Sequence, residues 1–533
     1  MSTVDTSMED DYTGSKTTRF IVLTALIVAL GGFLMGFDAS VISGVNKFVE
    51  LEFELTKLEL GWAVSSLTLT ATLAMLVAGP LSDRIGRKRV LTMAAILFTI
   101  SALGSAVAPN FAFLIFARMV GGIGVGASLI IAPMYIAEIS PPHLRGRMVS
   151  FNQLNIVLGI SAAFFSNYLI LKWGQSDAEW AQRLGLGEYN WRWMLGVEAI
   201  PAIFYFFGLF LVPSSPRWLA MKGRYEEAYK IMTRACGPRQ AKKIIESVKE
   251  SMGEEKEEDK LPVKALFQPA LRLVLTIGIV IAVLQQITGI NSVFFYAPMI
   301  FEQSGIGTDA AFSQAIYVGL INLVFTLLAI SLIDKLGRKP LLVFGVTGIA
   351  VCMFILAYGF HSATYQLDEE RLTELPVEID RVQLAAMVGM SYENDVAYKQ
   401  ALRENLGETA AKTYESELIT AAVSMNAVLI LIGILGFVAS FAMSIGPVMW
   451  VLFSELFPNW IRGLAISFVG LVNSAVSFGV QLIFPWELET LGSTMTFALY
   501  GIFAVLGLLF ILAKVPETKG RSLEELEKIL VKK

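Results

Sequence analysis

Long apolar runs constrain the fold of this chain more than any other feature. Twelve runs, each close to the roughly 20 residues that a helix needs to cross a bilayer, follow one another along the sequence. Backbone polar groups inside a membrane must be paired within the segment, so we expect each run to be a helix. Hydrophobic residues make up 55% of the 533 residues and charged residues 17%, whereas soluble domains have about 45–50% and about 25%. The sequence predicts an all-α membrane protein with twelve transmembrane helices, at about 20–43, 61–82, 90–108, 111–136, 149–171, 193–212, 271–298, 312–333, 340–360, 422–453, 464–485 and 494–514.

The loops between these runs predict the orientation. Of the 42 lysines and arginines, about 31 fall on the side that carries both termini and about 10 on the opposite side. Positive charge is typical of cytoplasmic loops, so both termini should be cytoplasmic. We expect a multi-pass protein of the plasma (inner) membrane, and a monomer.

The composition also argues against several functions. The net charge of −4 does not favour binding to nucleic acid. Two cysteines and two histidines provide few soft ligands, so we expect no metal and no cofactor. The sequence shows no paired catalytic carboxylates and no nucleophile with its base, so we expect no enzyme.

Three motifs occur twice and in the same order. The motif GPLSDRIGRKRVL (79–91) matches SLIDKLGRKPLL (331–342), AEISPPHLRG (137–146) matches SELFPNWIRG (454–463), and VPSSPRW (212–218) matches VPETKGR (515–521). The offset grows from about 251 for the first pair to 317 for the second, which places an acidic insertion at about 361–421. Parallel repeats of six spans around a central site are typical of transporters.

The repeats divide the chain. We expect a cytoplasmic tail at 1–19, a six-helix bundle at 20–213, a cytoplasmic helical linker at 214–270, a second bundle at 271–514 and a cytoplasmic tail at 515–533. The insertion should form a partly helical cap on the extracytoplasmic side, because its second half consists of helix-forming residues. We expect this cap to lie outside the transport path; a lid over the path is the alternative.

Two opposite charges lie deep inside apolar runs. Asp38 is in the first run and Arg118 in the fourth, and neither is near a helix end. A charge at bilayer depth costs at least about 2.5–3.5 kcal/mol, so it usually has a partner and marks a path for ions or substrate. We expect a functional pair for proton coupling, with Glu198 as a weaker candidate for relaying the change. A purely structural pair is the alternative.

The repeated motifs place further charges at the ends of spans on the terminal side. Glu138 with Arg145 or Arg147, and Glu455 with Arg462, can join neighbouring helix ends by charge-assisted bonds. Such pairs would hold a cytoplasmic gate closed. Alternatively, these charges only reflect the usual excess of lysine and arginine on the cytoplasmic side. The predicted gate comprises Asp83, Arg84, Arg87, Glu138, Arg145, Arg147, Arg217, Asp334, Arg338, Glu455 and Arg462.

The motif set resembles the sugar porter family of the major facilitator superfamily. The resemblance rests on DRIGRK (83–88), PMYIAEISPPHLRGR (133–147), PSSPRW (213–218), QQITGIN (285–291), DKLGRK (334–339), GPVMWVLFSELFPNWIRG (446–463) and PETKGRS (516–522). Within the family the chain looks most like the bacterial proton-coupled pentose and hexose symporters. The resemblance implies import of a monosaccharide in symport with a proton, by alternating access.

The resemblance also implies a set of sugar-binding residues: Gln153, Gln285, Gln286, Asn291, Asn322, Trp450 and Asn473. Amides suit this role because they donate and accept at once, as sugar hydroxyls do. The family usually has an aromatic residue at the positions of Ser474 and Met35 and a tyrosine at that of Phe295, so the preferred sugar stays open among xylose, glucose, galactose and fructose. A facilitative sugar uniporter of the same fold and a transporter-like sugar sensor remain alternatives.

A glycine-rich segment has a structural explanation. GGIGVG at 121–126 lies inside an apolar run and follows no strand, unlike a dinucleotide-binding loop. We expect close helix packing there.

Overall fold

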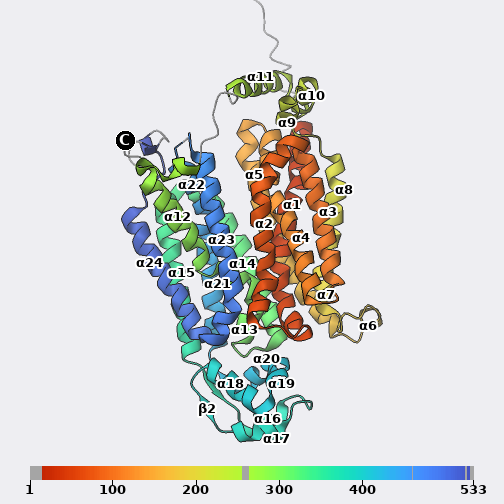
Figure 1. Ribbon diagram of the computed structural model, residues 1–533, viewed down its shortest axis with the longest axis vertical. Coiled ribbons are helices and arrows are strands. Elements are labelled where there is room, and N and C mark those ends of the chain that lie inside the picture. Colours follow the sequence, from red (N-terminus) through yellow and green to blue (C-terminus); the bar gives the residue numbers. More distant parts are fainter. Residues whose placement is uncertain (1–14, 255–262, 459, 522–524, 528–533) are drawn as a thin grey trace, which may run out of the picture. The chain divides into compact units, whose positions relative to one another are not determined.

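Twelve apolar helical segments dominate the fold. The computed structural model describes residues 15–254, 263–458, 460–521 and 525–527 (Figure 1). Within these residues, 12 segments are long and apolar enough to cross a membrane, and each falls on one of the predicted runs. The predicted all-α membrane fold is therefore confirmed. Nine of the described spans are single helices: α1 (Ser15–Glu52), α2 (Lys57–Ile85), α3 (Arg87–Ala106), α4 (Phe111–Ile139), α5 (Pro142–Gly174), α14 (Gly307–Leu336), α15 (Arg338–His361), α23 (Arg462–Thr490) and α24 (Gly492–Lys514).

The other three spans are interrupted. They consist of the pairs α7 (Asn190–Gly196) and α8 (Ala199–Leu211), α12 (Arg272–Ile287) and α13 (Ile290–Glu302), and α21 (Ala427–Met443) and α22 (Ile445–Leu456). Gly289 separates α12 from α13 with a left-handed φ of 89°, and an added Cβ would lie 2.4 Å from the Tyr500 ring. Only glycine fits such a position without strain. Ser444, with a φ of −127° and a ψ of −102°, separates α21 from α22.

The chain divides into two compact units, which we describe separately. The first contains residues 1–39, 69–160 and 195–260, and the second contains residues 40–68, 161–194 and 261–533. The second unit therefore includes the ends of several helices from the first six spans. The predicted boundaries of the two bundles, the linker and the tails stay predictions. Parts of the predicted tails and linker lie outside the described residues, namely 1–14, 255–262, 522–524 and 528–533.

Helices of the first unit touch through their backbones. In this unit α3 packs along α4 and α8. A Cβ on Gly36 of α1 would lie 2.0 Å from the carbonyl oxygen of Ile156 on α5, and a Cβ on Gly159 would lie 2.0 Å from that of Phe33. On α4, a Cβ on Gly126 would lie 2.2 Å from the carbonyl oxygen of Ala71. The predicted close packing of the glycine-rich segment is confirmed.

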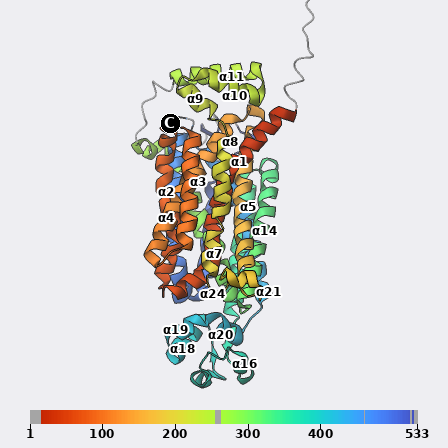
Figure 2. The same cartoon turned by 90° about the vertical axis from the view of Figure 1, so that its right-hand side faces the viewer.

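Short helices complete both units. A group at one end of the first unit consists of α9 (Pro216–Met221), α10 (Tyr225–Cys236) and α11 (Pro238–Glu254) (Figure 2). Trp218, Leu219 and Ala228 form a small buried core between them. The second unit has α6 (Glu179–Arg183) and the 3-10 helices at Val263–Phe267 and Pro269–Leu271.

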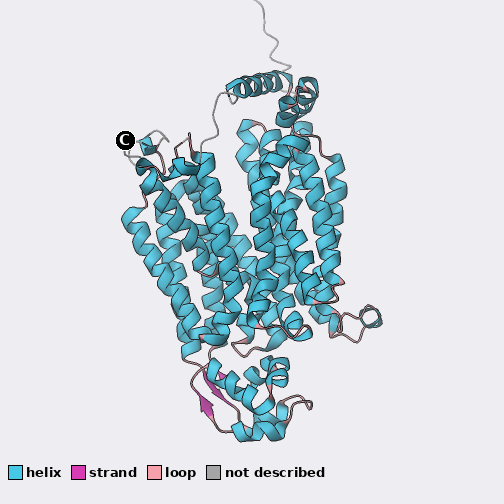
Figure 3. Cartoon of the chain, viewed as in Figure 1, coloured by secondary structure: helices cyan, strands magenta, loops and turns pink. Residues whose placement is uncertain are grey.

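The insertion between α15 and α21 folds as a small α/β body at one end of the second unit. Figure 3 shows its strands among helices. Its elements are β1 (Thr364–Gln366), α16 (Glu369–Glu374), α17 (Arg381–Leu384), a 3-10 helix (Ala385–Met387), β2 (Ser391–Tyr392), α18 (Asp395–Leu406), α19 (Glu408–Thr413), α20 (Glu415–Ala422) and β3 (Val423–Ser424). The strands pair antiparallel in the order β2-β1-β3. The expected helices are confirmed, whereas the sheet was not predicted.

The insertion has its own apolar core. Tyr365 stacks on Tyr398 with 5.5 Å between ring centroids, and Leu384 and Leu418 are fully buried beside them. Two contacts join it to α24: Asp395 accepts hydrogen bonds from the Ser493 backbone N–H at 3.0 Å and from its hydroxyl at 2.9 Å. We call the membrane side that carries the insertion the insertion side, and the other the terminal side.

Candidate functional site

Asp38, Arg118 and Glu198 form a buried charged cluster in the first unit. Arg118 Nη1 on α4 lies 3.4 Å from Asp38 Oδ1 on α1, and each of these side chains is 2% exposed. Glu198, at the start of α8, is 2% exposed and interacts electrostatically with both. The structure therefore brings together the three residues predicted for proton coupling.

The cluster has two features suited to binding a proton. The cluster consists of two carboxyl groups and one guanidinium, so one proton on a carboxylate balances its charge. Asp38 Oδ2 and Glu198 Oε1 are buried and have no hydrogen-bond partner in the described part of the chain. Gly121 provides the space beside Asp38, since a Cβ there would lie 2.8 Å from Asp38 Oδ2. Buried acceptors without a donor are costly, and a proton on one of them supplies a donor.

A hydrogen-bonded chain of amides runs from the interrupted seventh span to α23 in the second unit. Asn473 Nδ2 donates to Gln285 Oε1 at 2.8 Å, and Gln286 Nε2 donates to Asn473 Oδ1 at 3.1 Å. Asn291 Nδ2 donates to Gln286 Oε1 at 2.7 Å. Four of the predicted sugar-binding residues thus lie next to one another. Discontinuous helices with polar groups at the break are typical of substrate sites in transporters.

The chain of amides extends through three residues that the sequence analysis missed. Asn291 Nδ2 and Gln481 Nε2 donate to Ser477 Oγ at 2.7 and 2.8 Å, and Thr68 Oγ1 donates to Gln481 Oε1 at 2.8 Å. Asn473, Ser477 and Gln481 are four residues apart, which places them on one face of a helix. This spacing was the signal in the sequence.

The remaining predicted sugar residues lie elsewhere on the spans. Gln153 is exposed on α5 in the first unit, and Asn322 is buried on α14 in the second. Trp450 on α22 is 48% exposed. Its ring lies beside Gly470, where an added Cβ would be 3.7 Å away, one turn from Asn473 on α23.

Charged residues on the terminal side of the first unit form one bonded set. Arg87 donates to both carboxylate oxygens of Glu138, from Nε at 3.2 and 3.1 Å and from Nη2 at 3.1 Å, and donates from Nη1 to Asp83 Oδ1 at 2.6 Å. The Ser215 hydroxyl donates to Glu138 Oε2. Arg87 and Glu138 are both nearly buried, with side chains 5% and 7% exposed. The set joins α3, α4 and the start of α9.

The second unit repeats this set at the matching positions. Arg338 donates from Nε to Glu455 Oε2 at 3.1 Å and from Nη2 to Glu455 Oε1 at 2.8 Å, and Thr518 Oγ1 donates to Glu455 Oε2 at 2.6 Å. Arg87 and Arg338 also donate to equivalent backbone carbonyls, those of Ser82 and Ile333, each at 3.1 Å. The repeat seen in the sequence is therefore a repeat of geometry.

The expected partners of Glu138 and Glu455 were wrong. Arg145 Nε donates to the Ala137 carbonyl at 3.1 Å, and Arg462 Nε donates to the Phe457 carbonyl at 3.1 Å. Each guanidinium caps a helix end, because the last carbonyls of a helix lack partners within it and carry partial negative charge. Arg84, Arg147 and Arg217 have exposed side chains. The side chain of Asp334 lies outside the described residues.

Comparison with known proteins identifies the family. The sequence model of the family "Sugar (and other) transporter" matches residues 24–371 and 407–530. The arabinose-proton symporter of Bacillus subtilis is 32% identical over 100% of both chains. The D-xylose-proton symporter of Escherichia coli is 33% identical over 96% of both.

Solved structures agree with this match. The inward-open xylose transporter XylE from E. coli gives a TM-score of 0.72 at 31% identity, covering 96% of this chain and 100% of that one. A structure of XylE bound to 6-bromo-6-deoxy-D-glucose, described as a proton:xylose symporter of the major facilitator superfamily, gives a TM-score of 0.67 at 32% identity. This chain belongs to the sugar transporter family of the major facilitator superfamily.

Proposed function

We propose that this protein imports a monosaccharide, a pentose or a hexose, in symport with a proton. The observation that carries the proposal is the buried cluster of Asp38, Arg118 and Glu198, in which Asp38 lies 3.4 Å from Arg118 and Glu198 interacts electrostatically with both. Relatives that are 32–33% identical over at least 96% of their length are named arabinose-proton and D-xylose-proton symporters. A transporter of this kind leaves its substrate chemically unchanged, so we infer no enzymatic activity.

Asp38 is the proposed proton acceptor. While both carboxylates are ionised, the cluster holds one negative charge in excess, and an uncompensated buried charge is costly. A proton bound at Asp38 removes that excess and weakens the attraction between α1 and α4. Glu198 then remains as the partner of Arg118, so the guanidinium is not left unpaired when the proton is bound.

The amide chain is the proposed sugar site. Gln285, Gln286, Asn291 and Asn473 offer donors and acceptors that already pair with one another, so a sugar exchanges one set of hydrogen bonds for another. Gln153, Asn322 and Trp450 complete the proposed set. The exposed face of Trp450 suits the apolar face of a pyranose ring.

Alternating access between two membrane sides requires gates. The two charge sets around Glu138 and Glu455 are the proposed gate on the terminal side, with Asp83, Arg84, Arg87, Arg145, Arg147, Arg217, Asp334, Arg338 and Arg462 as its further members. The excess of lysine and arginine on this side supports cytoplasmic termini in the plasma (inner) membrane. We infer that a monomer in the bilayer carries out transport.

Transport in proteoliposomes tests the proposal. Labelled xylose, arabinose, glucose, galactose and fructose are offered in counterflow, which needs no gradient, and then in uptake driven by an inward proton gradient. A proton symporter should exchange its sugar in the first assay and accumulate it in the second. Counterflow without gradient-driven accumulation would instead identify a uniporter. The absence of both, with every sugar, would contradict the proposal.

A further inference from the structure

The insertion is bonded to the ends of the membrane helices. Glu415, the first residue of α20, lies 2.9 Å from Lys399 Nζ and accepts a hydrogen bond from Gln303 Nε2 at 3.2 Å. Gln303 follows directly after α13, the second half of the interrupted seventh span. The neighbouring Ser416 hydroxyl lies 3.3 Å from the hydroxyl of Thr308, at the start of α14. The insertion thus contacts both helices that meet at this corner.

The same corner holds the ends of α1 and α2. Lys47 Nζ on α1 donates to Thr308 Oγ1 at 2.7 Å and to Glu302 Oε1 at 3.2 Å. Lys57 Nζ, at the start of α2, lies 2.5 Å from Glu50 Oε1. These residues belong to the second unit, together with the insertion. Bonds from the first six spans to the second six therefore close the insertion side here.

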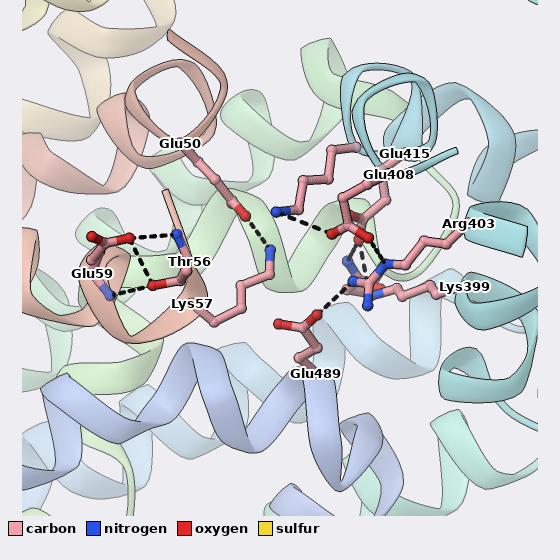
Figure 4. A network of polar contacts seen from close by, with 11 residues as sticks. Glu50, Thr56, Lys57, Glu59, Lys399, Arg403, Glu408, Glu415 and Glu489 are labelled. Atoms are coloured by element: carbon pink, nitrogen blue, oxygen red, sulfur yellow. Dashed lines mark hydrogen bonds and ion pairs between the residues drawn. The ribbon is translucent and has the colours of Figure 1, made fainter. Parts of the chain in front are cut away.

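Lys57 links these bonds to the insertion. It is attracted by Glu415 of the insertion and by Glu489 of α23, and Glu489 in turn accepts from Arg403 of α18 at 2.6 Å. Figure 4 shows Lys57 with Glu50 on one side of this network and the insertion's Arg403 and Glu415 on the other. A small pocket lies among these groups and is lined by Lys47, Lys57, Lys412, Glu50, Glu302 and Glu415.

These charges are shielded enough to matter energetically. The side chains of Lys57 and Glu50 are 13% and 9% exposed, and those of Lys399 and Glu415 are 14% and 24% exposed. Exposed pairs contribute little, whereas partly buried pairs are screened less by water and salt. Burial works to raise the pKa of Glu415, but Lys399 and Lys57, with hydrogen bonds from Lys399 and Gln303, hold it below its ordinary value.

Part of the insertion falls outside the match to the family's sequence model. The family's sequence model matches up to residue 371 and resumes at residue 407, so residues 372–406 have no counterpart in it. This segment includes Lys399 and Arg403, which hold Glu415 and Glu489. Lys399 and Arg403 therefore lie outside the match to the family model, whereas Glu415 and Ser416 lie within it.

We propose that the insertion is a clamp on the insertion-side gate: through Glu415 and Ser416 it holds the ends of α13 and α14 against those of α1 and α2, and so stabilises the closed state of this side. The clamp rests on the proposed transport by alternating access. Opening of this side separates Lys57 from Glu415, so the free energy of that attraction adds to the barrier between the two states.

Cysteine accessibility tests the clamp without sugar or proton. Leu51, which lines the pocket, becomes the reporter as Leu51→Cys in a background with Cys236→Ser and Cys352→Ser. The rate of labelling by a membrane-impermeant maleimide, added on the insertion side, is compared between Glu415→Gln and Glu370→Gln. Glu370 is an exposed residue on α16 of the same insertion, so the control loses the same charge outside the network.

The clamp predicts labelling about fivefold faster in Glu415→Gln than in the reporter alone, and unchanged labelling in Glu370→Gln. Labelling in Glu415→Gln as slow as in the reporter alone would overturn the clamp. An equal increase in Glu415→Gln and Glu370→Gln would also overturn it, because it would mean that the insertion has loosened as a whole. If Glu415→Gln does not fold, the Leu51→Cys reporter with Glu415 intact is labelled at two salt concentrations instead. Its labelling rate should then rise between 0.1 and 1 M NaCl, relative to an exposed Glu370→Cys reporter, because the Debye length falls from about 10 to about 3 Å. No rise would refute the clamp, whatever the outcome of the transport assays.

Discussion

Asp38→Asn tests the proposed proton site most directly. Asparagine has nearly the same shape as aspartate but carries no charge, so the cluster would hold Glu198 and Arg118 alone, with balanced charge and no need for a proton. A potential of 100 mV supplies about 2.3 kcal/mol per charge. At about 1.4 kcal/mol per tenfold, one coupled proton supports roughly 50-fold accumulation of sugar. We expect this ratio to fall to about one in the variant.

The assay is uptake of the labelled sugar into proteoliposomes under an imposed potential of 100 mV, negative inside, with counterflow measured in parallel. Counterflow should persist, because Asp38 is not among the proposed sugar-binding amides. Asp309→Asn is the matched control: it makes the same change in a pair with Lys172 whose side chains are 41% and 46% exposed, and it should retain accumulation. Uphill uptake that is as strong in Asp38→Asn as in the control would refute the proposed role of Asp38.

Four further predictions concern the sites and the insertion. Gln286→Ala removes bonds to three neighbouring amides and should weaken sugar binding at least about tenfold by calorimetry, since a lost hydrogen bond costs about 1.4 kcal/mol; unchanged affinity would exclude it from the site. Gly121→Ala places a Cβ 2.8 Å from a carboxylate oxygen of the charged cluster and should lower accumulation at least about fivefold, whereas Gly79→Ala, where a Cβ meets nothing within 4 Å, should not. Glu138→Gln removes the buried charge partner of Arg87 and leaves only the half-exposed carboxylate of Asp83, so it should lower the melting temperature by several degrees, the expected sign for a loss of up to about 3 kcal/mol; an unchanged melting temperature would contradict the buried pair. The lowered pKa of Glu415 means that its stabilising bonds are complete above the ordinary glutamate value and are lost only as pH falls through the lowered one. Labelling of the pocket reporter, divided by that of an exposed Glu370→Cys reporter at the same pH to cancel the falling thiolate fraction, should therefore stay constant between about pH 7.5 and 5.5; a rise of this ratio on acidification would show that another group titrates there.

Apolar length and repeated motifs were sufficient to predict the twelve spans and the repeat. The close approach of Asp38 to Arg118 followed from the cost of burying either charge alone. Hydrogen-bond partners at the span ends could not be predicted in the same way. Glu138 has several arginines within reach of its loop, and only the packing of α3 against α4 selects Arg87, 51 residues away in sequence.

Small elements were also beyond sequence reasoning. The strands of the insertion are two or three residues long, too short for an alternating pattern to be recognised. The four-residue spacing of Ser477 and Gln481 from Asn473 places them on its helix face but does not assign them to the site, because a serine or glutamine in an apolar helix is commonly satisfied by a neighbouring helix. Their role in the amide chain depends on the break at Gly289, which brings Asn291 to α23.

The backbone contacts at Gly36 and Gly159 have a mechanical consequence. Where α1 and α5 touch without intervening side chains, neither helix can rotate or slide past the other without first separating, so this pair must move as a single stiff rod. Interrupted spans behave differently, and those of the second unit have bending points at Gly289 and Ser444. Spans of one repeated pattern therefore differ in elasticity: the α1–α5 pair transmits displacement, whereas the interrupted spans α12–α13 and α21–α22 absorb it.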